Sequence, residues 1–249
     1  MSGPCAADAA HGDNPPVSSP LSVEREGDVA LVTLDRPEKR NALSIELRER
    51  LTEAFAGLAS DDGIGCVALT GAGSAFCAGM DRSEFGGDRE HKERLVRVSV
   101  DVFRAVGRCP KPVLAAVNGP AIAGGFALAL LCDLRIASDD ARFGFPELPM
   151  GIPPAYAAAR AALPAALVRE LCLTGRMVDA SEARELGICS QVVTPADLMT
   201  RARELAERVA ALPRPAVLKT KERILIENER VWGPLFAQEE SDLRQALLG

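Results

Sequence analysis

The sequence predicts an α/β fold, in which largely parallel strands are covered by helices, followed by a part made of helices alone. Up to about Pro164, short apolar runs of strand length alternate with stretches of helical periodicity. Beyond that point only helical patterns follow. Because parallel strands are joined by long crossovers, usually helices, the alternation predicts a largely parallel sheet.

Four apolar runs bounded by Gly, Pro or Asp predict strands at 29–34, 66–70, 112–117 and 134–137. Ser44 is expected to cap a first helix, whose apolar positions 47, 51, 55 and 58 share one face. The charged segment 81–94 predicts a solvated loop that leads into a second helix. From Gly124 onward the pattern predicts a helix that is apolar all round and therefore buried.

The second half of the chain predicts five further helices. Their expected ranges are 165–173, 180–186 with Asp179 before it, 195–212 after Thr194, 216–229 and 234–248. We therefore expect a disordered tail over 1–20, an α/β core over 21–195 and a helical region over 196–249. The tail has neither a basic nor an apolar segment of the kind found in signal peptides.

Composition excludes several function classes. The 249 residues are 47% hydrophobic and 26% charged, with a net charge of −6, which argues against nucleic-acid and membrane-surface binding. The uncharged run 113–132 is interrupted by Asn-Gly-Pro and Gly-Gly, so it predicts a buried strand, turn and helix rather than a membrane span.

Cysteine and histidine usage narrows the chemistry further. Seven irregularly spaced cysteines without a CxxC pair indicate reduced thiols in a cytoplasmic protein, with no metal site. Cys77 could be a nucleophile, although its small apolar neighbours favour a packing role. The chain has only two histidines, His11 in the tail and His91 in a charged stretch, which argues against a Ser-His-Asp or Cys-His system.

Two turns of small residues, 75–79 (AFCAG) and 121–125 (AIAGG), each follow a predicted strand. Turns of Ala and Gly let a ligand approach the main chain closely. Two of them can direct two backbone N–H groups at one developing oxyanion, which stabilises reactions at a carbonyl. The sequence therefore predicts carbonyl or thioester chemistry.

Two other motifs suggest ligand-binding roles. Residues 71–76 (GAGSAF) resemble a dinucleotide fingerprint, but Phe76 stands in place of the third glycine and no ribose-binding acid follows, which disfavours a nucleotide fold. Residues 36–41 (RPEKRN) place three cations in one loop, which fits either a solvated loop or a phosphate clamp.

The chain resembles the crotonase superfamily, which contains the enoyl-CoA hydratases and isomerases. The resemblance extends from about Leu21 to the C-terminus. It is carried by 36–43 (RPEKRNAL), 76–81 (FCAGMD), 116–125 (AVNGPAIAGG) with Cys132-Asp133, and 143–147 (FGFPE). It implies a crotonase (ClpP-like) ββα spiral with a C-terminal helical region that forms trimers, often paired as hexamers.

The resemblance also implies roles for single residues. Ala78 and Gly124 would supply the two oxyanion-hole N–H groups, and Glu147 of the Pro-Glu motif would be the catalytic acid or base. The substrate, acyl-CoA, would be the only small molecule required, without a further cofactor. Residues expected to bind it are Lys39, Arg40, Ala42, Ala78, Gly79, Met80, Asp81 and Gly124.

The chain departs from the hydratase pattern at one position that matters. Hydratases of this superfamily use two glutamates, and here the first is replaced by Ala127, with no acid between 119 and 132. In addition, 153–156 (PPAY) stands where Gly-Gly-Thr is common. Adding water needs activation of water and delivery of a proton, work that paired carboxylates share. One carboxylate is enough to move a proton between C2 and C4.

We therefore expect an enoyl-CoA isomerase of fatty-acid metabolism with a single catalytic glutamate, acting through an oxyanion-stabilised dienolate. The flanking Phe145, Pro146 and Leu148 predict an apolar site that raises the pKa of Glu147. Alternatives are a non-catalytic acyl-CoA-binding protein, an enoyl-CoA hydratase with weak activity, and a decarboxylase or hydrolase that relies on the oxyanion hole.

Overall fold

The structure is a computed structural model that describes residues 19–248; residues 1–18 and 249 lie outside the described part. The predicted tail over 1–20 therefore lies outside the described residues, except for Ser19 and Pro20. Cys5 and His11 lie outside them too.

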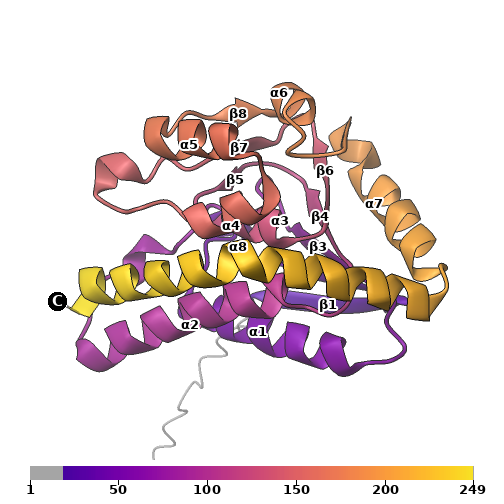
Figure 1. Ribbon diagram of the computed structural model, residues 1–249, viewed down its shortest axis with the longest axis horizontal. Helices are drawn as coiled ribbons and strands as arrows, with labels where there is room; N and C mark the ends of the chain where they lie inside the picture. Colours follow the sequence, from indigo (N-terminus) through magenta and orange to yellow (C-terminus); the bar gives the residue numbers. More distant parts are fainter. Residues whose placement is uncertain (1–18, 249) are drawn as a thin grey trace, which may run out of the picture.

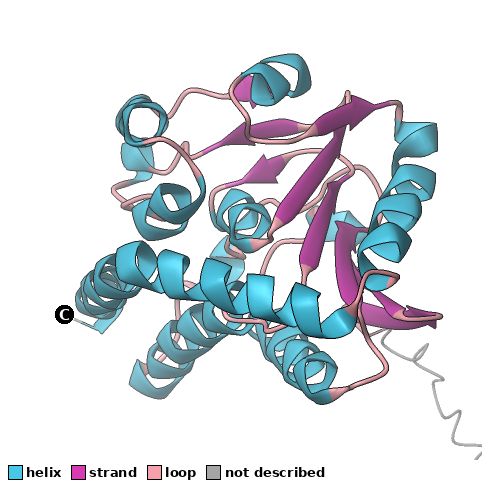
Figure 2. Ribbon diagram, turned by 45° about the vertical axis from the view of Figure 1, so that its right-hand side comes forward, coloured by secondary structure: helices cyan, strands magenta, loops and turns pink. Residues whose placement is uncertain are grey.

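Two sheets form the framework, with helices around them (Figure 2). The larger sheet has six strands in the order β1-β2-β3-β4-β6-β9, and the smaller has three in the order β5-β7-β8. Only β1 runs antiparallel in the larger sheet. The strands are β1 (Leu21–Glu26), β2 (Val29–Leu34), β3 (Cys66–Gly71), β4 (Val113–Val117), β5 (Ala121–Ile122), β6 (Leu134–Ser138), β7 (Arg142–Gly144), β8 (Val178–Asp179) and β9 (Gln191–Val193).

Eight α-helices and three short 3₁₀ helices surround these strands in the described residues (Figure 1). The α-helices are α1 (Ile45–Ser60), α2 (Arg89–Gly107), α3 (Gly124–Leu131), α4 (Tyr156–Ala162), α5 (Ala165–Thr174), α6 (Ala180–Glu185), α7 (Pro195–Ala210) and α8 (Arg214–Leu248). The 3₁₀ helices are η1 (Pro37–Lys39), η2 (Arg82–Glu84) and η3 (Leu148–Met150).

The larger sheet is buried on both faces because its strands alternate between two clusters of apolar side chains. Ala30 and Val32 point into the main core, whereas Val29 and Leu31 pack with Leu198 and other residues of α7. This arrangement explains why the strand runs are nearly continuously apolar. The predicted parallel α/β fold is confirmed, as is the cap of α1, where the Ser44 side chain accepts a hydrogen bond from the Leu47 N–H.

Several sequence predictions differ from the structure. Strands β8 and β9 lie beyond Pro164, where only helices were predicted, because runs of two and three residues are too short to show a strand pattern. The edge strand β1 was not predicted, because most of its side chains are exposed or half-buried and its pattern is weak. The loop predicted over 81–94 is wrong in its second half, since α2 begins at Arg89, where the Asp88 side chain caps the His91 N–H at 2.8 Å. The helices predicted over 216–229 and 234–248 form one continuous helix, α8.

Helix α8 continues through Pro234 because its neighbouring aromatic side chains are buried. Proline removes one helical hydrogen bond. In compensation, Trp232 and Phe236 are buried and stack with ring centroids 4.7 Å apart, while α8 packs along α2 and α4 (Figure 1). Nearer the N-terminus of α8, Lys221 pairs with both carboxylate oxygens of Asp133 at 2.6 and 2.7 Å and links α8 to the start of β6.

None of the helices in residues 19–248 is long and apolar enough to cross a lipid bilayer. The uncharged run 113–132 folds as β4, β5 and α3, as predicted.

Candidate active site

The two small-residue turns lie against each other at the ends of neighbouring strands. Strands β3 and β4 are parallel neighbours, so the segments that follow them leave the sheet at the same edge. The Ile122 N–H donates to the Cys77 carbonyl at 2.9 Å, and the Phe76 and Cys77 N–H groups both donate to the Pro120 carbonyl, at 3.1 and 3.2 Å. The backbones of the two turns are thus joined directly by hydrogen bonds.

Glycine is required where the turns touch. A Cβ atom on Gly125 would lie 2.1 Å from the Cys77 carbonyl oxygen, and one on Gly79 would lie 2.9 Å from the Ala123 Cβ atom. Gly79 also has a φ of +91°, in the region that favours glycine. These two glycines let the first turn contact the start of α3.

Gly124 is the first residue of α3, and its N–H is oriented by an unusual conformation at Ala123. Ala123 has φ 54° and ψ −123°, a strained combination for a residue with a side chain. Its N–H donates to the Gly144 carbonyl at 2.9 Å and its carbonyl accepts from the Ala127 N–H at 3.0 Å, so the peptide is fixed on both sides. No residue in the described range accepts a hydrogen bond from the Gly124 N–H. This donor, at a helix N-terminus, suits an anion.

The Ala78 N–H, which is expected to be an oxyanion-hole donor, has an acceptor within the protein. Its N–H donates to the Arg40 carbonyl oxygen at 3.0 Å. An oxyanion that binds both Ala78 and Gly124 must therefore share the Ala78 N–H with Arg40 or replace Arg40 as its acceptor.

The basic loop that contains Arg40 is tied to the first turn. Arg40 and Asn41 both have positive φ, 50° and 54°, and the buried Asn41 side chain donates to the Ala72 and Ala75 carbonyls at 2.9 and 2.8 Å. Lys39 and Arg40 are exposed at the tip of the loop. Two cations are thus presented to solvent beside the Ala78 turn, which fits both the solvated-loop and the phosphate-clamp interpretation.

The remaining predicted binding residues follow in the same segments. Leu43 pairs with Met80, since its N–H donates to the Gly79 carbonyl at 2.7 Å, and Ala42 is buried just before it. Asp81 forms an ion pair with Arg36 at 3.0 Å, so its carboxylate holds the basic loop against the turn. Met80 is half-buried beside these residues.

Glu147 is a buried carboxylate close in the chain to the segment that supports Gly124. Strand β7, which ends at Gly144, pairs with β5. Glu147 follows three residues later and is 6% exposed. Its Oε2 atom has no hydrogen-bond partner in the described residues. Burial raises the pKa of Glu147 to about 7. The preceding Phe145 packs on Phe126 of α3, with ring centroids 4.8 Å apart.

Comparison with known proteins assigns the family. A family model described as enoyl-CoA hydratase/isomerase matches residues 24–241. The chain belongs to the enoyl-CoA hydratase/isomerase family. A short-chain-enoyl-CoA hydratase of Clostridium acetobutylicum is 36% identical over 207 residues, covering 81% of this chain and 79% of the relative.

Solved structures agree with this assignment. A monofunctional enoyl CoA isomerase from M. smegmatis is 35% identical with a TM-score of 0.71, covering 85% of this chain and 95% of that one. An enoyl-CoA hydratase/isomerase from Mycobacterium paratuberculosis is 28% identical with a TM-score of 0.84, covering 93% and 94%. The predicted crotonase superfamily and fold are thereby confirmed. The trimer or hexamer implied by the resemblance stays a prediction, since the structure contains one chain.

In this member of the enoyl-CoA hydratase/isomerase family, the first turn of α3 carries no acid. Ala127 lies three residues after Gly124 and is fully buried among the apolar side chains of the core. The described residues hold no group of three or more His, Cys, Asp or Glu side chains suited to a metal ion. Burial raises the pKa of Cys77 to about 12, so its thiolate, the nucleophilic form, is disfavoured. His91 lies at the start of α2 and its ring contacts the Glu84 carbonyl.

Two ionisable side chains near these segments were not predicted from the sequence. Glu239 of α8 accepts a hydrogen bond from the Ala157 N–H at 2.7 Å, and burial raises its pKa to about 7. Burial raises the pKa of Cys172 to about 12, and the charges of Glu147 and Glu239 raise it further, so both carboxyls lie near this thiol. Arg48 of α1 is the second missed side chain. No sequence signal marked either residue, because both lie in charged helical runs.

Proposed function

We propose that this protein is an enoyl-CoA isomerase that converts a 3-enoyl-CoA into a 2-enoyl-CoA. Glu147, as a carboxylate, removes a proton from C2, and the electron pair of that C–H bond moves into a dienolate. The Gly124 N–H, together with the Ala78 N–H in exchange for its bond to Arg40, stabilises the enolate oxygen. Glu147 then returns the proton at C4, so no other reactant is consumed.

The observation that carries the proposal is a single buried carboxylate combined with an alanine at position 127. Glu147 has an oxygen without a partner in the described residues and a pKa raised by burial, properties of a base held in an apolar site. Ala127 offers no second group to activate water. The exposed cations of Lys39 and Arg40 support binding of the CoA phosphates, and acyl-CoA is the substrate without a further cofactor.

The test compares two substrates of equal chain length. Incubation with 3-enoyl-CoA is expected to give 2-enoyl-CoA, and hydration of 2-enoyl-CoA is expected to be at least about 10²-fold slower, because a general acid–base group is missing. Chromatography of the CoA esters separates the products. Hydration faster than isomerisation would contradict the proposal and identify a hydratase.

The pH dependence gives a second prediction. The base must be deprotonated, and its pKa is raised to about 7. We therefore expect kcat/KM for isomerisation to be constant above pH 8 and to fall about tenfold per pH unit below pH 6. Initial rates between pH 5 and 9 measure it. A profile that stays flat down to pH 5 would exclude Glu147 as the titrating base.

A second candidate is a non-catalytic acyl-CoA-binding protein. The observation that favours it is the hydrogen bond between the Ala78 N–H and the Arg40 carbonyl, which occupies one of the two oxyanion donors. Calorimetry with a saturated acyl-CoA, combined with the assay above, separates the candidates: binding without turnover of either enoyl ester supports this second one.

A further inference from the structure

Helix α1 carries a buried arginine on the face that packs toward α2. Ile45, Arg48 and Thr52 are spaced three and four residues apart and therefore share one face of the helix. Arg48 is 1% exposed. Ile45 packs with Leu95 and Val98 of α2, which places this face at the contact between the two helices.

The Arg48 guanidinium has no partner for its two terminal nitrogens. Nη1 and Nη2 are both buried without a hydrogen-bond acceptor in the described residues, and so is the Thr52 Oγ1 atom one turn further on. Leaving a buried charge unpaired is strongly unfavourable. In this family member, then, three polar atoms on one helix face lack partners at the same place.

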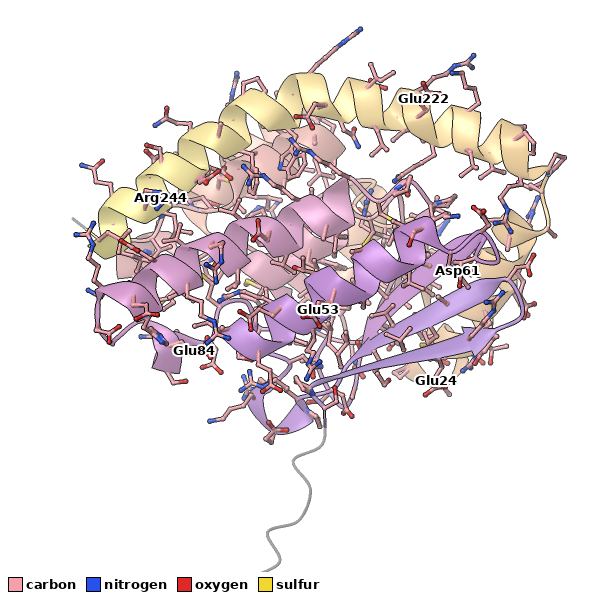
Figure 3. All side chains as sticks on the ribbon, turned by 90° about the horizontal axis from the view of Figure 1, so that it is seen from below. Glu24, Glu53, Asp61, Glu84, Glu222 and Arg244 are labelled. Carbon is pink, nitrogen blue, oxygen red and sulfur yellow. The ribbon has the colours of Figure 1, made fainter. Side chains whose placement is uncertain are left out.

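The carboxylates nearest to Arg48 are engaged elsewhere. Glu84 lies beside the N-terminal end of α1, as Figure 3 shows, where its Oε2 atom accepts the Ile45 N–H at 2.7 Å. Asp81 is paired with Arg36 and accepts hydrogen bonds from Ser83. Neither carboxylate hydrogen bonds to Arg48, although both charges act on it. Burial outweighs them and lowers the pKa of Arg48 to about 10.

Helix α1 also begins beside the proposed oxyanion turn, since Leu43 pairs with Met80 and its N–H donates to the Gly79 carbonyl at 2.7 Å. The carboxylate of Asp81, next to Met80, is among the charges that act on Arg48. Half-buried Met80 and Phe85 pack against the cluster formed by Ile45, Leu95 and Val98. Met80 is thus shared between the segment that carries the Ala78 N–H and the apolar cluster one turn away from Arg48. Its flexible side chain can give way to an acyl chain.

We propose that Arg48 binds an anionic carboxylate at the far end of the substrate's acyl chain, so that the preferred substrates are CoA thioesters of dicarboxylic acids. This proposal rests on the acyl-CoA site proposed above and deepens it. A planar guanidinium with two free terminal nitrogens matches a carboxylate in a bidentate pair. The Thr52 hydroxyl can donate to the same group.

The burial of Arg48 favours a carboxylate over the phosphates of CoA. The phosphates carry more than one charge and suit the exposed cations at the tip of the basic loop, Lys39 and Arg40. A single buried guanidinium balances one charge, that of a carboxylate, and a ligand that brings this charge supplies the partner missing from the empty protein.

The test measures binding and turnover with matched thioesters. Calorimetry on the full-length protein compares a saturated acyl-CoA that ends in a carboxylate with one of equal length that ends in a methyl group. The acyl-CoA that ends in a carboxylate is expected to bind about 10²-fold more tightly, since the acyl-CoA that ends in a methyl group leaves the buried polar groups unpaired. CoA alone is the third arm. If Arg48 binds a phosphate instead, R48M weakens the binding of CoA and of both acyl-CoAs equally, and this result overturns the proposal.

Three variants complete the experiment. R48M is expected to remove the preference for the acyl-CoA that ends in a carboxylate, while the acyl-CoA that ends in a methyl group still binds. R48K is expected to retain part of that preference. R50M is the matched control, because Arg50 lies on the same helix with its side chain 58% exposed. R48M also removes an unpaired buried charge, so its thermal midpoint is expected to equal or exceed that of the wild type. Equal affinity of the wild-type protein for the two acyl-CoAs overturns the proposal.

The result is independent of the isomerase assay. A carboxylate preference that R48M abolishes, without turnover of any enoyl ester, supports the role of Arg48 while the isomerase proposal fails. Turnover of enoyl-CoAs with equal kcat/KM for chains that end in a carboxylate and in a methyl group supports the isomerase proposal and overturns the role of Arg48.

Discussion

Replacing Glu147 with glutamine is expected to lower kcat for isomerisation by roughly 10²–10⁴-fold, the range typical of losing a general base. Glutamine has nearly the same shape and can still occupy the buried site, but its amide cannot accept the C2 proton. Since the variant retains the backbone donors and the basic loop, its affinity for acyl-CoA is expected to stay within a few fold. Stopped assays of 3-enoyl-CoA conversion, together with calorimetry, measure both quantities.

The matched control is E239Q. Glu239 is also a buried carboxyl with a pKa raised to about 7, but its Oε1 atom accepts the Ala157 N–H, and the glutamine oxygen can do the same. We expect E239Q to retain isomerase activity within a few fold. Full activity in E147Q, or an equal loss in both variants, would contradict the assignment of Glu147 as the base.

Changing Gly125 to alanine is expected to separate the two turns and to remove most of the activity. The new Cβ atom would lie 2.1 Å from the Cys77 carbonyl oxygen and 2.7 Å from the Cys77 carbonyl carbon, both backbone atoms that cannot rotate away. Overpacking of this kind costs about 3 kcal/mol or more in the free energy of unfolding. The displacement would also misalign the Gly124 N–H relative to Ala78, and each oxyanion donor contributes roughly 10²–10³ in rate.

Gly124 provides the comparison for stability. A Cβ atom there would meet its nearest neighbours, the Leu43 and Phe103 side chains, at 3.5 and 3.6 Å, which are ordinary contacts. G124A is therefore expected to change the free energy of unfolding by less than about 1 kcal/mol. Urea denaturation of both variants tests the pair. Equal stabilities would mean that the turns are not packed as described.

Much of the fold could be predicted because its information is local. The strands of the larger sheet are apolar runs between turn residues, and Ser44 and Asp179 mark helix starts by side-chain chemistry that works within a few residues. Strand β1 was not predicted because it is an edge strand in which only two of the six residues are apolar. The continuity of α8 through Pro234 depends on aromatic packing against other helices, which no local pattern reveals.

Some features of the candidate site could likewise be predicted from the local sequence, and others could not. The small residues of the two turns indicated that both could serve one oxyanion, and the apolar neighbours of Glu147 predicted its raised pKa. The bond between Ala78 and the Arg40 carbonyl could not be predicted, because it depends on two successive residues with positive φ held by the Asn41 side chain. Arg48 looked like one more charge in a helix, and only packing against α2 shows that it is buried.

The Arg40 carbonyl has a consequence for selectivity between states of the substrate. This peptide oxygen accepts the hydrogen bond of the Ala78 N–H, so a substrate oxygen must compete with it. A thioester carbonyl is a weaker acceptor than a peptide carbonyl and gains little from the exchange. An enolate oxygen carries a full negative charge and is the stronger acceptor. In the proposed isomerase reaction, the Arg40 carbonyl would therefore withhold one donor from the bound reactant and yield it to the dienolate intermediate, a differential binding that accelerates a reaction.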